Sequence, residues 1–307
     1  MLHYYEHSQK RSDKVGVWLI KRASLINNVR EHGVVDFKGM YTSVLSPDYK
    51  FPSSVIREDL ELEGTIVESI RKKQEKKYAL IHLHGGAYVL GYNDTYRKMA
   101  LRYLDSDEDL TVYSLLYSLA PKHPYPTALE ETVRLYNHLL AIGHKPEDIL
   151  FAGDSAGGGL AIATTLYLRD NNIPLPKALI TMSPWTNLAM NGESHEANKY
   201  IDPLFGEGSK PLNVKAYSRR ESVLNPYISP KYGDFSRFTS LLMFVGGDEL
   251  IKSDTIDVAE AAKANNEVIV HNFLGMFHVF PLAFDKMSSS REAWKIIREY
   301  INNKLRG

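Results

Sequence analysis

The chain has 307 residues, a length that suits a single α/β domain with an insertion. Its 37 Lys and Arg residues balance 37 Asp and Glu residues, and this zero net charge excludes a global field that would attract nucleic acid or an anionic membrane. The absence of cysteine excludes disulfides, zinc–thiolate sites and cysteine nucleophiles. Because the first residues lack a basic start followed by an apolar core, and every apolar run is too short to span a bilayer, we expect a cytoplasmic protein without membrane insertion.

The first part of the chain, residues 1–52, shows no alternation of strands and helices. It contains an amphipathic stretch, Val15–Val29, and a second possible helix near Asp36–Leu45. Two β-rich runs follow, Ile56–Glu63 and Thr65–Arg71, separated by Gly64. We predict that they pair as antiparallel strands at the start of a sheet.

From residue 78 onward, short β-rich runs alternate with longer helical patterns. The predicted strands are Tyr78–His84, Leu110–Leu116, Ile149–Gly153, Ala178–Ser183, Leu241–Gly246 and Val268–Phe273. The predicted helices are Tyr96–Leu104, Thr127–Ile142, Gly157–Asp170, Ser253–Ala264 and Ser290–Leu305. The alternation indicates an α/β fold whose mostly parallel sheet, of about eight strands, is flanked by helices. The long irregular segment 186–232 interrupts it and predicts an inserted lid or cap.

The segment Gly153–Gly157 follows the pattern G-x-S-x-G between a predicted strand and a predicted helix. This context is typical of a nucleophile elbow, a sharp turn that presents its serine above the sheet. The hydroxyl of Ser155 would then lie at the N-terminus of the next helix, where the helix dipole favours developing negative charge. The pattern therefore predicts a nucleophilic serine.

A serine hydroxyl needs a base to remove its proton, and the base needs an acid to orient it. In α/β-hydrolase sheets these residues occur in the chain order serine, acid, histidine. Asp248 and His278 both follow predicted strands directly, at the sheet edge where open α/β sheets bind their ligands. We predict that they are the acid and the base. Asp254 competes for the role of acid, but its position at a helix start favours a capping role.

Five ordered motifs resemble those of the hormone-sensitive-lipase-like carboxylesterases, a family of the α/β-hydrolase superfamily. They are residues 84–87, 117–126, 153–158, 247–250 and 275–278. The resemblance implies an α/β-hydrolase fold with Ser155 as the nucleophile, Asp248 as the acid and His278 as the base. It also implies an N-terminal cap segment at residues 1–52 and a catalytic domain at residues 53–307, with a cap insertion at about residues 186–232.

The same resemblance places the oxyanion hole, which binds the negative oxygen of the tetrahedral intermediate through backbone N–H groups. It maps Gly85, Gly86 and Ala87 to the oxyanion loop and Ala156 to its partner, and Gly86, Ala87 and Ala156 are the expected donors. The family more commonly has a third glycine where this chain has Ala87. A methyl group leaves the N–H available, so we expect the hole to be retained.

The expected function is hydrolysis of small-molecule esters with short-to-medium acyl chains, through an acyl-enzyme and without a cofactor or a metal. Tyr88 is expected to contribute to substrate binding, although an aromatic side chain in such a region can equally belong to the core. The same triad would serve an amidase, a formamidase or a carbamate hydrolase, and the scaffold would also suit a non-catalytic ligand-binding relative. A homodimer is a further expectation, because the predicted strand Val268–Phe273 would form a sheet edge.

Overall fold

A computed structural model describes residues 1–30, 45–74, 77–206 and 214–307. Across these residues, the strands form one nine-stranded sheet in the order β1-β9-β8-β7-β6-β4-β5-β3-β2. The strands are β1 (Leu2–His7), β2 (Ile56–Leu62), β3 (Thr65–Arg71), β4 (Tyr78–Leu83), β5 (Leu110–Leu115), β6 (Ile149–Asp154), β7 (Ala178–Met182), β8 (Ser240–Gly246) and β9 (Val268–Phe273). The α/β-hydrolase architecture predicted from the sequence is thus confirmed.

The centre of the sheet is parallel, and only β2 and β3 pair in antiparallel fashion with their neighbours. Every residue of β4, β5, β6 and β7 is buried, which explains why these strands are almost continuous apolar runs. The hairpin between β2 and β3 turns at Glu63 and Gly64, both with positive φ, as the glycine between the two runs indicated. The predicted antiparallel start of the sheet is confirmed.

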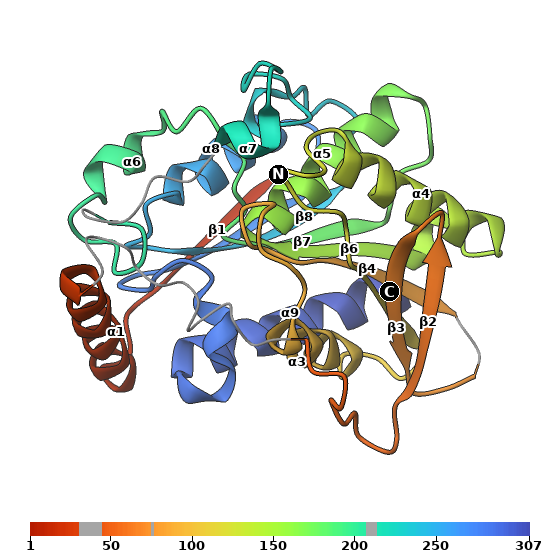
Figure 1. Cartoon of the computed structure of the whole chain (residues 1–307), viewed down its shortest axis with the longest axis horizontal. Helices are drawn as coiled ribbons and strands as arrows, with labels where there is room; N and C mark the ends of the chain where they lie inside the picture. Colours follow the sequence, from red (N-terminus) through yellow and green to blue (C-terminus); the bar gives the residue numbers. More distant parts are fainter. Residues whose placement is uncertain (31–44, 75–76, 207–213) are drawn as a thin grey trace.

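Helices cover both faces of the sheet (Figure 1). They are α1 (Arg11–Arg30), α3 (Asp94–Leu104), α4 (Thr127–Ala141), α5 (Ser155–Asp170), α6 (Glu193–Ala197), α7 (Val214–Ser218), α8 (Lys252–Ala262) and α9 (Ser288–Arg306). Short 3-10 turns are η1 (Pro146–Asp148), η2 (Pro230–Tyr232) and η3 (Phe280–Lys286). Helices α4, α5 and α8 pack on one face, and α3 and α9 pack on the other. Two apolar cores result, one on each side of the sheet.

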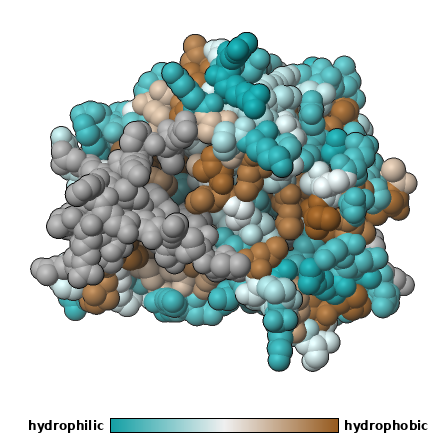
Figure 2. Space-filling view, viewed as in Figure 1, coloured by the Kyte–Doolittle hydropathy of each residue, from teal (hydrophilic) through white to brown (hydrophobic). Residues whose placement is uncertain are grey.

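Alternation along each strand divides the side chains between the two cores. In β4, Ala79, Ile81 and Leu83 join the core under α4 and α5, whereas Tyr78 and Leu80 join the core under α3 and α9. On the coloured part of the face shown in Figure 2, hydrophobic residues gather near the middle and also occur among the hydrophilic residues toward the edges. No helix of the described residues is long and apolar enough to cross a membrane.

Strand β1 is the main difference from the sequence-based expectation, which had placed residues 1–52 in a cap. Its residues pair in parallel with β9, from Leu2 opposite Val268 to His7 opposite Phe273. Strand β9 is therefore an interior strand, and the argument for a dimer from a free β9 edge was wrong. The sequence pattern does not indicate this strand, because β1 is partly exposed along its whole length and has no buried apolar face.

The two segments expected to form a cap are described in part. Helix α1 contains the predicted amphipathic stretch Val15–Val29, whereas the possible helix near Asp36–Leu45 falls mainly on residues 31–44, outside the described residues. In the predicted insertion 186–232, the described residues form the short helices α6 and α7 and the turn η2. The division between a cap and a catalytic domain stays a prediction.

Candidate active site

Ser155 lies in a sharp turn between β6 and α5. Its φ of +49° is in the left-handed region, which non-glycine residues adopt only where the surrounding structure imposes it. Both glycines of the motif are required by close packing. A Cβ on Gly153 would lie 2.5 Å from the carbonyl oxygen of Gly157, and a Cβ on Gly157 would lie 2.1 Å from the carbonyl oxygen of Leu83. The local geometry is that of the predicted elbow.

His278 connects this serine to a carboxylate. Its Nε2 lies 2.9 Å from the Oγ of Ser155, and its Nδ1 lies 2.9 Å from the Oε2 of Glu249. The side chains of Glu249 and His278 are almost completely buried, so water competes little for these contacts. The three side chains form a continuous line from carboxylate to imidazole to hydroxyl, although they are far apart in the sequence.

The structure corrects the predicted acid, since Glu249 and not Asp248 contacts the histidine. The chain turns after β8, where the N–H of Asp248 donates to the carbonyl of Met276. Glu249 is directed inward, and its Oε1 also accepts from the N–H of Gly246. Partial burial raises the pKa of Asp248, an effect opposed by the charges of Lys21 and Lys252. The sequence did contain the relevant signal, a pair of adjacent carboxylates after the strand, but not the direction of each side chain.

Asp254, the alternative candidate for the acid, contacts a different histidine, His195. It is fully buried in the first turn of α8, where its Oδ1 contacts the Nε2 of His195 at 2.9 Å. Its Oδ2 accepts the backbone N–H groups of Thr186 and Asn187. The position at a helix start was predicted correctly, although Asp254 binds N–H groups of another segment.

The predicted oxyanion loop, residues 85–87, packs against the residue that precedes Ser155. The N–H of Gly85 donates to the Oδ1 of Asp154 at 2.9 Å, so this group is engaged in holding the loop. Gly86 and Ala87 have φ angles of +113° and +52°, and their N–H groups make no hydrogen bond to the described part of the chain. Ala156 lies in the first turn of α5, where backbone N–H groups lack intrahelical partners. The arrangement leaves Gly86, Ala87 and Ala156 as the available donors.

Two buried groups support this loop without contacting Ser155. The ring of His84 stacks on Tyr117 with centroids 4.1 Å apart, and its Nδ1 lies 2.7 Å from the carbonyl oxygen of Gly85. Burial lowers the pKa of His84 to about 4, which keeps the ring neutral near pH 7. Burial also raises the pKa of Asp154 to about 7, against the opposing effect of the hydrogen bond from Gly85. Their contacts give both residues a structural role in this loop.

Tyr88, the predicted substrate-binding residue, is only 1% exposed. Its ring stacks on Tyr217 with centroids 3.7 Å apart and lies 6.3 Å from the ring of Trp185. Phe205, from the insertion, contacts the ring of His278 edge-on at 4.8 Å. Tyr88 therefore belongs to a packed aromatic stack, and Phe205 brings an aromatic ring against His278.

Comparison with known proteins shows the family of this chain. A family model described as the alpha/beta hydrolase fold matches residues 80–282. The chain is 37% identical to the putative acetyl-hydrolase LipR of Mycobacterium tuberculosis over 215 residues, covering 70% of this chain and 69% of LipR. It is 32% identical to an acetyl-hydrolase of Streptomyces hygroscopicus over 235 residues, covering 76% and 78% of the two chains. A crystal structure of an esterase from the bacterial hormone-sensitive lipase family superposes with a TM-score of 0.81 and 27% identity, covering 97% of this chain and 99% of that one.

Proposed function

This chain belongs to the hormone-sensitive-lipase-like family of α/β-hydrolase carboxylesterases, and from this membership we propose that it hydrolyses short-to-medium acyl esters through an acyl-enzyme on Ser155. It is a serine hydrolase of carboxylic esters, and its substrates are small-molecule esters. The observation that carries the proposal is the position of His278, within 2.9 Å of both Ser155 and Glu249.

In the proposed mechanism, the Oγ of Ser155 attacks the ester carbonyl while the Nε2 of His278 takes its proton. Glu249 keeps the imidazole oriented through Nδ1 and stabilises the positive charge that forms on the ring. The tetrahedral intermediate collapses when His278 protonates the departing alcohol. A water molecule, deprotonated by the same histidine, then attacks the acyl-enzyme and releases the acid.

The negative oxygen of the intermediate is proposed to bind the N–H groups of Gly86, Ala87 and Ala156. The support for this role is that Gly85 is occupied by Asp154, while the loop turns through positive φ angles that leave the next two N–H groups available. Each such donor contributes about 2.7–4 kcal/mol of transition-state stabilisation in serine hydrolases. The oxyanion hole would thus supply a large part of the rate enhancement.

The preference for short acyl groups rests on the packing around α5. A Cβ on Gly159 would lie 2.2 Å from the carbonyl oxygen of Trp185 and 3.4 Å from the Oη of Tyr88. The aromatic stack therefore packs directly on the helix that begins at Ser155, and it restricts the space beside the nucleophile.

We also propose that residues 1–52 and 186–232 contribute a cap to the catalytic domain 53–307, with β1 as the exception that belongs to the sheet.

The experiment compares the wild type and Ser155→Ala on p-nitrophenyl acetate, butyrate and octanoate, with a matched p-nitroanilide as the amide. We expect turnover of the acetate and butyrate, slower turnover of the octanoate, and loss of at least about 10³-fold in kcat for Ser155→Ala. A fluorophosphonate should label the wild type at Ser155, as mapped by peptide mass spectrometry. Equal rates in both proteins would refute the nucleophile, and faster cleavage of the anilide would indicate an amidase.

A further inference from the structure

The peptide group that follows Glu249 is held from both sides by the insertion 186–232. Its carbonyl oxygen, on Glu249, accepts a hydrogen bond of 2.8 Å from the Nδ2 of Asn198. Its N–H, on Leu250, donates to the Oδ2 of Asp202 at 2.5 Å. A peptide group is planar, so fixing its oxygen and its nitrogen together fixes its orientation. The direction in which Glu249 leaves the main chain therefore depends on two side chains of the insertion.

Asp202 also connects to the base. Its second oxygen, Oδ1, accepts the N–H groups of Leu204 at 2.7 Å and Phe205 at 3.0 Å. The ring of Phe205 then packs against the ring of His278, tilted by 73° to it. A single carboxylate thus links the loop that carries Glu249 with the ring that packs on His278.

The burial of these groups makes their hydrogen bonds specific. Asp202 and Asn198 are only 6% and 8% exposed. Burial raises the pKa of Asp202, whereas the three N–H groups that it accepts favour the charged form. If the carboxylate of Asp202 moves away from one of these N–H groups, that buried N–H is left without a hydrogen bond. Such an unsatisfied buried group raises the free energy of the fold. The insertion therefore has one favoured position relative to the catalytic acid.

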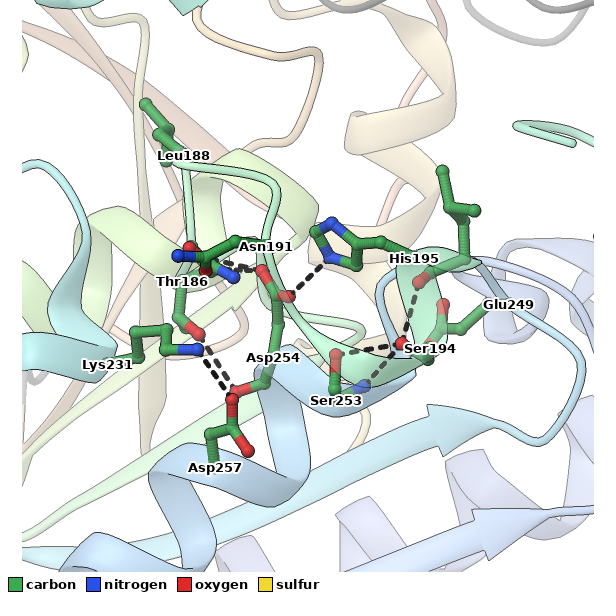
Figure 3. Close-up of polar contacts among 12 residues, drawn as sticks. Thr186, Leu188, Asn191, Ser194, His195, Lys231, Glu249, Ser253, Asp254 and Asp257 are labelled. Carbon is green, nitrogen blue, oxygen red and sulfur yellow. Dashed lines mark hydrogen bonds and ion pairs between the residues drawn. The ribbon is translucent and has the colours of Figure 1, made fainter. Parts of the chain in front are cut away.

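Other contacts attach the insertion to α8 without touching Glu249 or His278. Figure 3 shows His195 of α6 directed at Asp254, and Lys231 directed at Asp257 with 2.8 Å between Nζ and Oδ2. Ser194 bonds to Ser253 at 2.8 Å in the same view. The ion pair between Lys231 and Asp257 provides a control, because it holds the same two segments together but contacts neither Glu249 nor Leu250.

We propose that Asp202 and Asn198 are positioning residues of the esterase reaction, which place Glu249 and His278 only while the insertion is seated on the catalytic domain. The inference rests on the proposed role of Glu249 as the triad acid. The insertion then has two functions. It covers the substrate as part of the proposed cap, and it holds Glu249 and His278 in position. Displacement of residues 198–205 would release the peptide after Glu249 and the ring beside His278 together.

The test measures kcat and KM on p-nitrophenyl butyrate for Asp202→Asn, Asn198→Ala and the control Asp257→Asn. An amide has only one oxygen that accepts hydrogen bonds. An asparagine at position 202 therefore cannot accept from Leu250 with one atom and from Leu204 and Phe205 with the other, as the carboxylate does. We expect kcat to fall about 10- to 100-fold in the first two variants with KM changed less than about threefold, because a small displacement of catalytic groups slows the chemical step. Asp257→Asn loses an ion pair to the same insertion and should keep kcat within about twofold of the wild type.

A double-mutant cycle separates positioning from general destabilisation. In a Glu249→Gln background, adding Asn198→Ala should cause little further loss of kcat, because Asn198 holds only the loop of the acid and that acid is already absent. Independent, multiplicative losses, or wild-type kcat in both Asp202→Asn and Asn198→Ala, would overturn the inference. Wild-type kcat in Glu249→Gln would instead refute the proposed triad. If Asp202→Asn does not fold, Asn198→Ala decides, since it leaves the turn of Asp202 intact.

Discussion

At the scale of single residues, Asp248 and Glu249 have opposite environments although they are adjacent in the chain. Glu249 is fully buried and contacts both Gly246 and His278, whereas Asp248 is partly exposed and lies within the influence of two lysines. Both residues lie beyond the end of β8, where the N–H of Asp248 donates to the carbonyl oxygen of Met276 and the side chain of Glu249 contacts His278. The motif indicated where the proposed acid lies, and the turn after β8 brings Glu249 to the histidine.

Glu249→Gln should therefore lower kcat/KM far more than Asp248→Asn does. A glutamine keeps the size of the side chain but removes the charge that stabilises the imidazolium, and in serine hydrolases such a change costs about 10⁴-fold in kcat. Asp248→Asn should stay within about threefold of the wild type. Steady-state kinetics on p-nitrophenyl butyrate with both variants gives the comparison. A larger loss in Asp248→Asn would restore Asp248 as the acid.

At the scale of secondary structure, helix α9 begins without a capping side chain of its own. Met287 occupies the N-cap position, and its side chain makes no hydrogen bond. Asp13, in the first turn of α1, accepts the N–H groups of Ser288 and Ser289 and the hydroxyl of Ser289. The carboxylate also lies at the positive end of the α9 dipole. One helix is thus capped by a residue almost the whole chain length away.

Asp13→Ala should lower the free energy of unfolding by about 1–2 kcal/mol near pH 7. Burial raises the pKa of Asp13, but the hydrogen bonds from Ser289 and Ser288 outweigh it, so the pKa lies below its ordinary value of 3.8. A carboxylate with a lowered pKa stabilises the fold above its ordinary pKa, and this contribution is lost as the pH falls through the folded value. Urea unfolding should thus show a constant difference from the wild type at neutral pH that shrinks below about pH 4. The exposed neighbour Lys14 provides the control Lys14→Ala, and equal stability of the two variants would contradict the capping role.

At the scale of the whole molecule, the first residues of the chain form β1, an edge strand of the sheet that pairs with β9. Strand β1 covers β9, and its last residue, His7, stacks on Phe273 and contacts His271 at 2.8 Å and Glu292 at 3.1 Å. Without β1, the unpaired main-chain groups of β9 would form an exposed edge beside a buried apolar core. The first strand therefore protects the sheet as well as extending it.

Deletion of residues 1–9 should lower the thermal midpoint and increase self-association. The reason is that β9 would then offer its hydrogen-bonding edge to a second copy, and edge strands pair readily when they are uncovered. Size-exclusion chromatography with light scattering measures the change in mass relative to the full chain. Tyr4→Thr changes an exposed side chain of β1 but keeps its backbone pairing, so this control should behave as the wild type. An unchanged mass and midpoint after the deletion would show that β1 has no protective role.

The sequence by itself determined the features that depend on short stretches of chain. The β-rich runs predicted eight of the nine described strands within a residue or two at each end. For the central parallel strands the reason is that burial on both faces leaves little freedom of composition, whereas the glycine turn between β2 and β3 marked the antiparallel pair. The elbow at Ser155 and the candidate base His278 were also predicted, since close packing requires the glycines beside the serine and the histidine follows a recognisable strand.

Only the tertiary structure decided which residues complete the site and close the fold. The choice of Glu249 depends on a turn, the cap of α9 on a distant aspartate, and the covering of β9 on a strand with no apolar pattern. Asp202 and Asn198 act through backbone groups, which are the same in every residue type and therefore leave no trace in a sequence motif. Local patterns fix what a segment forms, whereas hydrogen bonds between distant segments depend on where the completed fold places them.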